Sequence, residues 1–435
     1  MIKALLNVTI YDYQTYHEKS YVLFDETIIK VGKMKDYINQ GFEELDGKGH
    51  MVLPNFVCGH THIYSAFARG MNVPFNPKNF QDILDQLWWK LDSHLDHEMI
   101  YYSGIVFATD FLKNGVTTLI DHHASGVDIK GSLDQLKKSV CEVANLRGIF
   151  AFETSDRFNV SDTIGENESF IKLNSLPCTA GLFGLHASMS LSENTLKDVK
   201  KHLHGAPIHI HVGESELDQK DCLAKYNERI IHRLDRHGLL TKNSILAHSI
   251  DISDEELDII KERECVIAVN FTSNMNNSVG VPPLSRYFEK GIRVIIGNDG
   301  ISSSMTTEYL YLYYATHLYD KSPTQFGFKE LIKMIQDTYL YASEILSIKL
   351  GRIEEGYVPD FMMIPYVAPT PINKDNVFGH LFFGMMNSFK PRYVFVGGKL
   401  LVNDYQIDKF LSTEYSKASK IAERLWNNIK RSELK

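Results

Sequence analysis

The sequence predicts an α/β fold, namely a (β/α)8 TIM-type barrel accompanied by a small β-sandwich that the N- and C-terminal segments build together. Two observations predict it. Eight apolar, strand-like runs alternate with amphipathic helical patterns through the middle of the chain, and short runs of alternating apolar and polar residues occur at both ends. The length of 435 residues suits such a barrel, which routinely reaches about 250 residues, together with a smaller unit.

The sandwich is expected to draw its N-terminal part from residues 1–51 and its C-terminal part, with a terminal helix, from residues 351–435. Neither segment has enough strands for a stable sheet alone, so we expect the two to pair. Gly397 and Gly398 in the second segment form a two-residue hairpin signal. The strand candidates of the two segments are 5–10, 21–24, 28–32, 351–364 and 392–402.

The barrel is expected in residues 52–350. Its strand candidates are 52–62, 116–122, 148–153, 181–186, 207–211, 245–248, 265–271 and 293–299. Amphipathic stretches separate them, including 80–114, 133–145, 191–202, 223–237 and 254–262. A doubly wound open sheet is the alternative, but it predicts a glycine-rich phosphate loop after an early strand. The sequence has no G-x-G-x-x-G or Walker motif.

The composition is that of an ordinary globular protein with a large core, with 44% hydrophobic and 23% charged residues. The net charge of -8 is spread along the chain, which argues against nucleic acid and an anionic membrane surface as partners. Five widely spaced cysteines without a C-x-x-C pair indicate a reducing compartment. Because the N-terminus also lacks the apolar run and cleavage site of a signal peptide, we expect a cytoplasmic protein.

Histidine side chains end several of the predicted barrel strands, and an aspartate ends another. His60 and His62 end the first strand, and residues i and i+2 of a strand point to the same side, so both imidazoles can reach one metal ion. Later strands end in His186, in His209 with His211, in His248, and in Asp299. Barrel enzymes take their catalytic residues from these strand ends, so the set predicts an active site.

Four of these side chains offer three neutral nitrogens and one carboxylate to a divalent metal ion: His60, His62, His211 and Asp299. Zinc or ferrous iron suits this set, with room for one water, whose pKa the metal lowers towards about 7. A carboxylic acid is then needed to carry a proton to the leaving group, and Glu214, just beyond His211, is placed for it. His248 is suited to polarise the substrate atom that gains charge.

Four motifs follow one another along the chain: His60-Thr-His62, His211-Val-Gly-Glu214, His248 and Asn298-Asp299-Gly300. Together with the flanking segments 53–56 and 351–360, they resemble the amidohydrolase superfamily, in its aminohydrolase and chlorohydrolase branch, which includes guanine, adenosine-derivative and cytosine deaminases. Finer segments at 87–92, 121–125, 153–157 and 273–277 are similar to SsnA-type aminohydrolases associated with selenium metabolism. The resemblance covers nearly the whole chain.

The resemblance implies roles for these residues. The four ligands would hold one metal, Glu214 would shuttle the proton, Asp299 would also accept a proton from the water, and His248 would orient the attacking water or the substrate. Binuclear relatives carry a carboxylated lysine near the fourth strand, whereas residues 181–187 hold no lysine, so a mononuclear site follows by analogy. Many relatives have Asn-Pro-x-Ser-Asn after the seventh strand, where this chain has Asn-Phe-Thr-Ser-Asn at 270–274.

Five further residues are candidates for substrate binding: His186, Trp88, His123, Arg157 and Asn274. Trp88 lies in an apolar helical stretch, so core packing is the alternative to stacking on a substrate. Arg157 with Asp156 either recognises a carboxylate or a heterocycle edge of the substrate or forms a solvated ion pair. The roles of three histidines stay open between pocket lining and packing or capping: His122, His123 and His209.

We therefore expect a metal-dependent aminohydrolase, a deaminase that uses activated water to release ammonia from an amidine-like carbon of a heterocycle or related small molecule. Two alternatives are another C–N or C–Cl hydrolase on the same site, and a non-catalytic accessory or binding protein on the same fold. The expected cofactor is one divalent metal ion, zinc or iron. The expected partner is a small-molecule substrate, and a homodimer is an option.

Overall fold

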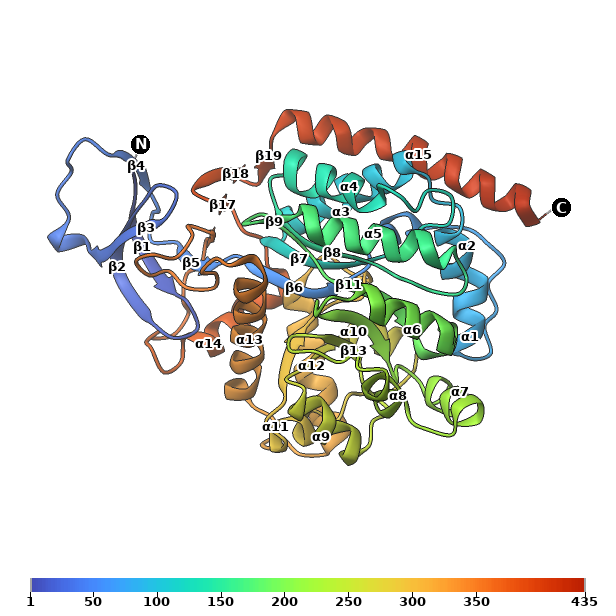
Figure 1. Cartoon of the computed structure of the whole chain (residues 1–435). Helices are drawn as coiled ribbons and strands as arrows, with labels where there is room; N and C mark the ends of the chain where they lie inside the picture. Colours follow the sequence, from blue (N-terminus) through green and yellow to red (C-terminus); the bar gives the residue numbers. More distant parts are fainter. Residues whose placement is uncertain (1, 434–435) are drawn as a thin grey trace.

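The computed structural model describes residues 2–433 and contains both expected units. Figure 1 shows a barrel of strands surrounded by helices, with a separate sheet at one side of it and helix α15 (Lys409–Glu433) running along the outside. The prediction of an α/β barrel with a small terminal β unit is confirmed.

Within residues 2–433, eight parallel strands make the barrel: the first three pair in chain order in one sheet, and the last five pair in chain order in a second. Two seams complete the ring. A parallel bridge between Thr154 and Leu185 joins the third strand to the fourth, and the backbone N–H groups of Asn298 and Asp299 donate to the carbonyl of His60 at 2.9 and 3.1 Å. The strands are β6 (Phe56–Thr61), β7 (Val116–His123), β8 (Arg147–Phe152), β11 (Phe183–Ala187), β12 (Ile208–Val212), β13 (Ile245–His248), β14 (Val266–Val269) and β15 (Arg293–Ile296).

Helices follow the strands and cover the outside of the barrel (Figure 1). α9 shows how the sequence starts one of them: Ser253 Oγ accepts from the N–H of Glu256 at 3.2 Å, and the Glu256 carboxylate accepts from the N–H of Ser253 at 3.0 Å. The helices are α3 (His97–Lys113), α4 (Ser132–Leu136), α5 (Val160–Leu173), α6 (Glu193–His202), α7 (Glu216–Tyr226), α8 (Ile230–Arg236), α9 (Asp254–Glu262), α10 (Phe271–Asn276), α11 (Leu284–Glu289), α12 (Met305–Asp320) and α13 (Phe328–Leu346). Before α3, the expected stretch 80–114 is broken into α1 (Phe80–Ile83), a π-helical turn (Leu84–Trp88) and α2 (Trp89–Asp92).

The two ends of the chain form one mixed sheet, in the order β19-β18-β17-β16-β5-β1-β2-β3, with β4 beside β1. Phe24 of β2 packs against Phe361 of β16 with ring centroids 5.1 Å apart, although two strands lie between them in the sheet. Neighbouring strands are about 4.8 Å apart, so the sheet folds over itself like a sandwich. Its strands are β1 (Lys3–Tyr11), β2 (Tyr16–Phe24), β3 (Ile28–Lys33), β4 (Glu43–Asp46), β5 (Met51–Pro54), β16 (Phe361–Ile364), β17 (Tyr393–Val396), β18 (Lys399–Asn403) and β19 (Gln406–Ile407).

Two strand predictions need correction. The expected strand 52–62 is two strands, because β5 pairs with β1 and β16 of the terminal sheet whereas β6 pairs with β7 of the barrel. Asn55 stands at the break, where its N–H donates to the carbonyl of Asp360 at 3.1 Å. The expected strand 351–364 is extended only from Phe361 to Ile364. The hairpin at Gly397 and Gly398 is confirmed, and both residues have positive φ (54° and 73°), as its tight turn requires.

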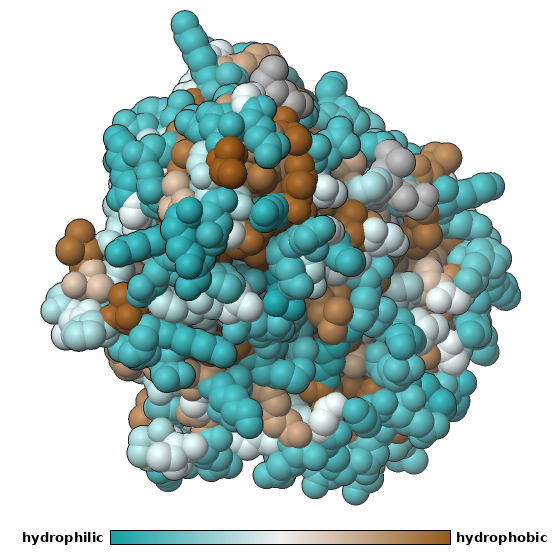
Figure 2. Space-filling model, turned by 90° about the vertical axis from the view of Figure 1, so that its left-hand side faces the viewer, coloured by the Kyte–Doolittle hydropathy of each residue, from teal (hydrophilic) through white to brown (hydrophobic). Residues whose placement is uncertain are grey.

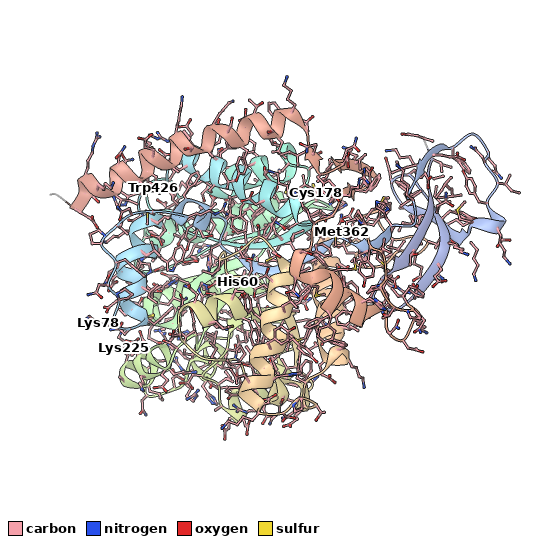
Figure 3. All side chains as sticks on the ribbon, turned by 180° about the vertical axis from the view of Figure 1, so that it is seen from behind. His60, Lys78, Cys178, Lys225, Met362 and Trp426 are labelled. Carbon is pink, nitrogen blue, oxygen red and sulfur yellow. The ribbon has the colours of Figure 1, made fainter. Side chains whose placement is uncertain are left out.

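Figure 3 shows His60 at the centre of the barrel and Met362 of β16 where the terminal sheet meets it. The face of the molecule seen in Figure 2 is mainly hydrophilic, with apolar side chains in separate patches. None of the helices in residues 2–433 combines the length and the apolar character that crossing a bilayer requires.

One buried ion pair ties the terminal sheet to the barrel. The Arg147 guanidinium, at the start of β8, donates to Asp360 Oδ2, and Asp360 Oδ1 accepts from the N–H of Gly397 at 2.6 Å. Both charged side chains are almost inaccessible, at 10% and 4% exposure. A buried pair with such partners fixes the position of the sheet relative to the barrel, because water could not solvate either charge if the pair separated.

We predict that Asp360→Asn destabilises the protein by about 3 kcal/mol or more, because it leaves the Arg147 charge buried without a counterion. Urea denaturation measures the change. The matched control is Asp254→Asn, which removes an exposed partner of Arg286. Equal stability of the two variants would contradict the role given to the buried pair.

Candidate metal centre and active site

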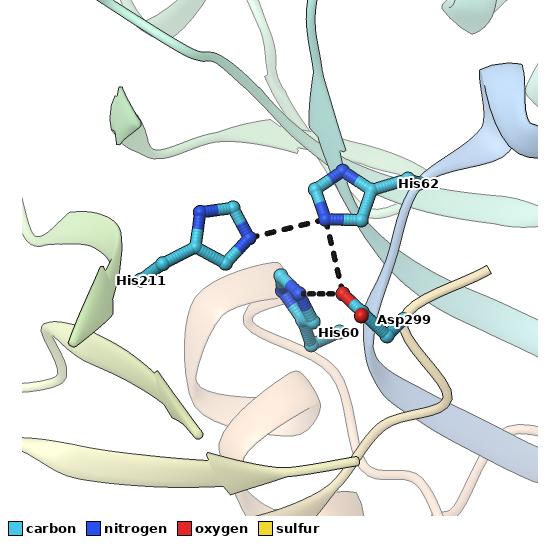
Figure 4. A group of neighbouring side chains, drawn as sticks. All are labelled: His60, His62, His211 and Asp299. Carbon is cyan, nitrogen blue, oxygen red and sulfur yellow. Dashed lines mark hydrogen bonds and ion pairs between the residues drawn. The ribbon is translucent and has the colours of Figure 1, made fainter. Parts of the chain in front are cut away.

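The four predicted metal ligands meet at one end of the barrel, as Figure 4 shows. His60 lies in β6 and His62 follows it, His211 lies in β12, and Asp299 follows β15. Asp299 Oδ1 lies 2.9 Å from His60 Nε2 and 3.1 Å from His62 Nε2. His62 Nε2 lies 3.1 Å from His211 Nε2. The strand ends therefore bring three ring nitrogens and one carboxylate oxygen to a single point.

Backbone carbonyls of neighbouring strands decide which ring nitrogens face this point. His62 Nδ1 donates to the carbonyl of His122 at 2.6 Å, and His211 Nδ1 donates to the carbonyl of His186 at 2.8 Å. Each ring therefore carries its hydrogen on Nδ1 and turns the lone pair of Nε2 towards the other ring. Lone pairs and a carboxylate so close together repel unless a cation lies among them, so these residues fit a metal ion.

The ionisation of the centre agrees with that fit. Burial lowers the pKa of His60 to about 4 and that of His211 well below its usual range, which leaves their nitrogens free to ligate. Burial opposes ionisation of Asp299, but His248 and the two histidines of the first strand hold the pKa of its carboxyl well below its usual range. Burial alone would lower the pKa of His62, whereas Asp299 raises it to about 9. The centre therefore takes up positive charge, as a proton or as a metal ion.

Three imidazole nitrogens and a carboxylate oxygen are a donor set that zinc accepts, and they form a site here for one metal ion. The close approach of strands β15 and β6 helps to bring Asp299 to it. Gly297 lies at this seam, where a Cβ atom would stand 2.6 Å from the His60 carbonyl oxygen, so only glycine permits the contact.

Glu214 and His248 lie beside the ligands. His248 ends β13, and its Nε2 lies 3.6 Å from Glu214 Oε2 and 3.8 Å from Asp299 Oδ1. Burial raises the pKa of Glu214 to about 7, although His248 opposes the change. A carboxyl group that titrates near neutrality therefore stands next to the metal ligands, as proton transfer to and from water requires.

Two residues of α10 hold these side chains in place. Ser273 Oγ donates to Asp299 Oδ2 at 2.5 Å, and His248 Nδ1 donates to Asn274 Oδ1 at 2.8 Å. Asn274 is 1% exposed and lies outside the walls of the cavity that opens onto the metal ligands. It therefore contacts His248, rather than the space that a substrate would take.

The other predicted substrate contacts divide into two groups. Trp88 and His186 line the cavity. Arg157 lies behind its wall, where Nη2 donates to Asp92 Oδ1 at 2.6 Å and the guanidinium covers the ring of Trp89 at 4.5 Å. His123 is fully buried outside the cavity walls, with its ring centroid 5.7 Å from that of Phe152.

Two of the histidines whose roles were open, His122 and His209, lie beneath the metal ligands. The rings of His122 and His209 stack with centroids 4.3 Å apart and planes 18° apart, and both are fully buried. His209 Nε2 lies 2.7 Å from His60 Nδ1, which is the distance of a hydrogen bond and involves the His60 nitrogen that faces away from the metal site. Their contacts therefore orient His60 from below.

Sequence reasoning missed four residues with carboxyl or amide side chains that line the cavity: Asp92, Glu153, Asp218 and Asn277. Glu153 directly follows β8, and its Oε1 lies 3.3 Å from His62 Nδ1. Burial raises the pKa of Glu153 to about 8, although His62 opposes the change. Its place at the end of the third predicted strand was the signal in the sequence, but one glutamate has no spacing pattern to distinguish it.

Comparisons with known proteins agree with this geometry. The model of the Amidohydrolase family matches residues 51–401. The chain is 26% identical to a 5'-deoxyadenosine deaminase of Methanosphaera stadtmanae, over 89% of this chain and 90% of that protein. It is 28% identical to a 5-methylthioadenosine/S-adenosylhomocysteine deaminase of Pyrococcus furiosus, over 81% of this chain and 84% of that protein.

Solved structures share the fold. An adenosine deaminase from Xanthomonas campestris with bound zinc superposes with a TM-score of 0.83 at 17% identity, covering 98% of each chain. An atrazine chlorohydrolase from Arthrobacter aurescens in complex with zinc gives a TM-score of 0.79 at 18% identity, covering 96% of this chain and 99% of that one. The expected resemblance to the aminohydrolase and chlorohydrolase branch is confirmed, and the chain belongs to the amidohydrolase family.

Proposed function

We propose that the protein is a zinc-dependent aminohydrolase that releases ammonia from an amidine-like carbon of a small nitrogen heterocycle. The observation that carries the proposal is the meeting of the three Nε2 atoms and the Asp299 oxygen beside the buried carboxyl group of Glu214. The names of the relatives support it, because those proteins are deaminases of 5'-deoxyadenosine and of 5-methylthioadenosine or S-adenosylhomocysteine.

In the proposed reaction, water adds to the carbon, the C–N bond breaks, and oxygen takes the place of the amino group. Zinc held by the four ligands would act as a Lewis acid that makes water a stronger nucleophile near neutral pH. Glu214 accepts one proton from the water and delivers it to the leaving amino nitrogen, which departs as ammonia. Asp299 accepts the second proton and passes it to the other nitrogen of the amidine-like group, where it stays in the product. His248, held through Nδ1 by Asn274, directs Nε2 towards Glu214 and orients the attacking water.

We assign direct contact with the substrate to Trp88 and His186, whose side chains line the cavity. The remaining predicted contacts receive indirect roles. Arg157 holds Asp92 and Trp89 in the cavity wall, Asn274 holds His248, and His123 packs behind the wall.

We place the reaction in the cytoplasm and propose a homodimer. All five cysteines are free thiols, which supports a reducing compartment.

Three apolar side chains at helical spacing on α12 are exposed, namely Tyr311 at 47%, Tyr314 at 48% and Leu318 at 80%. An exposed apolar face of this kind supports contact with a second copy.

We predict that light scattering gives a dimer for the natural chain and a monomer for Leu318→Arg, because the substitution places a charge in the apolar face. A natural chain that is monomeric would contradict the proposal.

We predict that protein purified without chelator carries about one zinc ion per chain and that His211→Ala carries far less, because it removes one of four ligands. Elemental analysis measures the content. The control is His202→Ala, which changes a histidine with a half-exposed side chain on α6 and should leave the zinc content unaltered. Two zinc ions per chain, or an unchanged content in His211→Ala, would contradict the assigned ligand set.

We predict that Glu214→Gln lowers kcat for ammonia release by about 100-fold or more, because the amide cannot carry the proton. The zinc content should stay that of the natural protein. The assay screens aminated heterocycles together with 5'-deoxyadenosine and S-adenosylhomocysteine. The control is Glu216→Gln, which removes a carboxylate that is 73% exposed two residues away. A Glu214→Gln variant with near-normal turnover would rule out the proposed proton carrier.

A further inference from the structure

Glu153 has a buried carboxyl group, one oxygen of which lacks a hydrogen-bond partner among the residues that the structure describes. Its side chain is 2% exposed and lines the cavity. Oε1 lies 3.3 Å from His62 Nδ1, but that N–H already donates to the carbonyl of His122 at 2.6 Å. Within residues 2–433, no hydrogen bond reaches Oε1. Burying a carboxylate oxygen without a hydrogen-bond donor costs free energy, so we expect a ligand to supply the missing donor.

His122 Nδ1 lies 3.5 Å from Glu153 Oε1 without forming a hydrogen bond to it. His186, which shares the cavity wall with Glu153, is an acceptor. Ser190 Oγ donates to the carbonyl of Ala187 at 3.1 Å, so it accepts from His186 Nδ1, which lies 2.7 Å away. His186 therefore carries its hydrogen on Nδ1 and presents the lone pair of Nε2. That nitrogen lies 3.9 Å from Glu153 Oε2. Two acceptors face the cavity together, and both are satisfied by a molecule that brings N–H donors.

The rest of the wall fits a flat cation. Aromatic rings line the cavity, including those of Tyr64, Phe80, Trp88 and Trp89. Five carboxyl groups line it as well, from Asp92, Glu153, Glu214, Asp218 and Asp299. Among the residues that the structure describes, no lysine or arginine lines the cavity, and the nearby Arg157 is bonded to Asp92. Aromatic faces attract a planar cation, and a cation bound beside Glu153 stabilises the ionised form of its carboxyl group, whose pKa burial raises to about 8.

We propose that Glu153 is a specificity-determining residue that, together with His186, binds a planar, positively charged group with adjacent N–H donors, such as an amidinium or a protonated aminated ring. This inference rests on the proposed function, because it names the class of substrate that the same site takes. It also separates this chain from relatives whose named substrate, S-adenosylhomocysteine, carries a carboxylate.

The test uses two probes of the same shape on the zinc-loaded full chain: benzamidine, which is cationic at neutral pH, and neutral benzamide. Quenching of tryptophan fluorescence reports binding, because Trp88 and Trp89 line the cavity. We expect benzamidine to bind at least about 10-fold more tightly than benzamide, as a charge-assisted hydrogen bond predicts. In Glu153→Gln this preference should fall to near parity, whereas Glu216→Gln should keep it.

Two results would overturn the inference: equal affinity of the natural protein for the two probes, or an undiminished preference in a folded Glu153→Gln variant that retains zinc. If that variant does not fold, the comparison in the natural protein still decides. Binding needs no turnover, so failure of this inference is distinguishable from failure of the proposed function. Ammonia release without a preference for benzamidine refutes the inference alone. A preference that depends on Glu153, with no ammonia released from any heterocycle, refutes the deaminase alone.

Discussion

Mutual repulsion among three imidazole lone pairs and one carboxylate is the constraint on which this structure depends. The rings cannot turn away, because the carbonyl of His122 on β7 holds His62 and the carbonyl of His186 on β11 holds His211. Strands adjacent to those that carry the ligands therefore fix the ligand tautomers. A closed parallel barrel supplies such carbonyls on every side, and a cation resolves the repulsion that the scaffold maintains.

Much of this arrangement could be predicted from the sequence, because it follows from short-range periodicity. Residues two apart on a strand share a side, which was enough to join His60 with His62, and the order of apolar runs was enough to count the barrel strands. The ligands come from strands far apart in sequence, but all parallel strands of a barrel end on one face. Their meeting, now seen at about 3 Å, needed no knowledge of the intervening loops.

What the sequence could not predict depends on contacts between distant segments. The run 52–62 is apolar on both sides of Asn55, so periodicity gives no sign that its halves join different sheets. Asn274 was expected at the substrate, but its contact with His248 depends on how α10 leaves the seventh strand. Glu153 is a single acidic residue, and what distinguishes it from an ordinary strand cap is its buried Oε1, which has no hydrogen-bond partner among the described residues.

Three residues at the strand ends of the active site have the left-handed backbone conformation that favours glycine. His248, Ser249 and Asp299 all have positive φ, at 71°, 52° and 57°. Each such residue costs about 1 to 3 kcal/mol, which glycine would avoid, but glycine offers neither an imidazole nor a carboxylate. Hydrogen bonds offset the strain: the N–H of Ser249 donates to Val212 O at 2.8 Å, and that of Asp299 to His60 O at 3.1 Å. Strain at these strand ends therefore persists because the His248 and Asp299 side chains have to point inwards, and the hydrogen bonds between neighbouring strands that hold their backbone help to position the site.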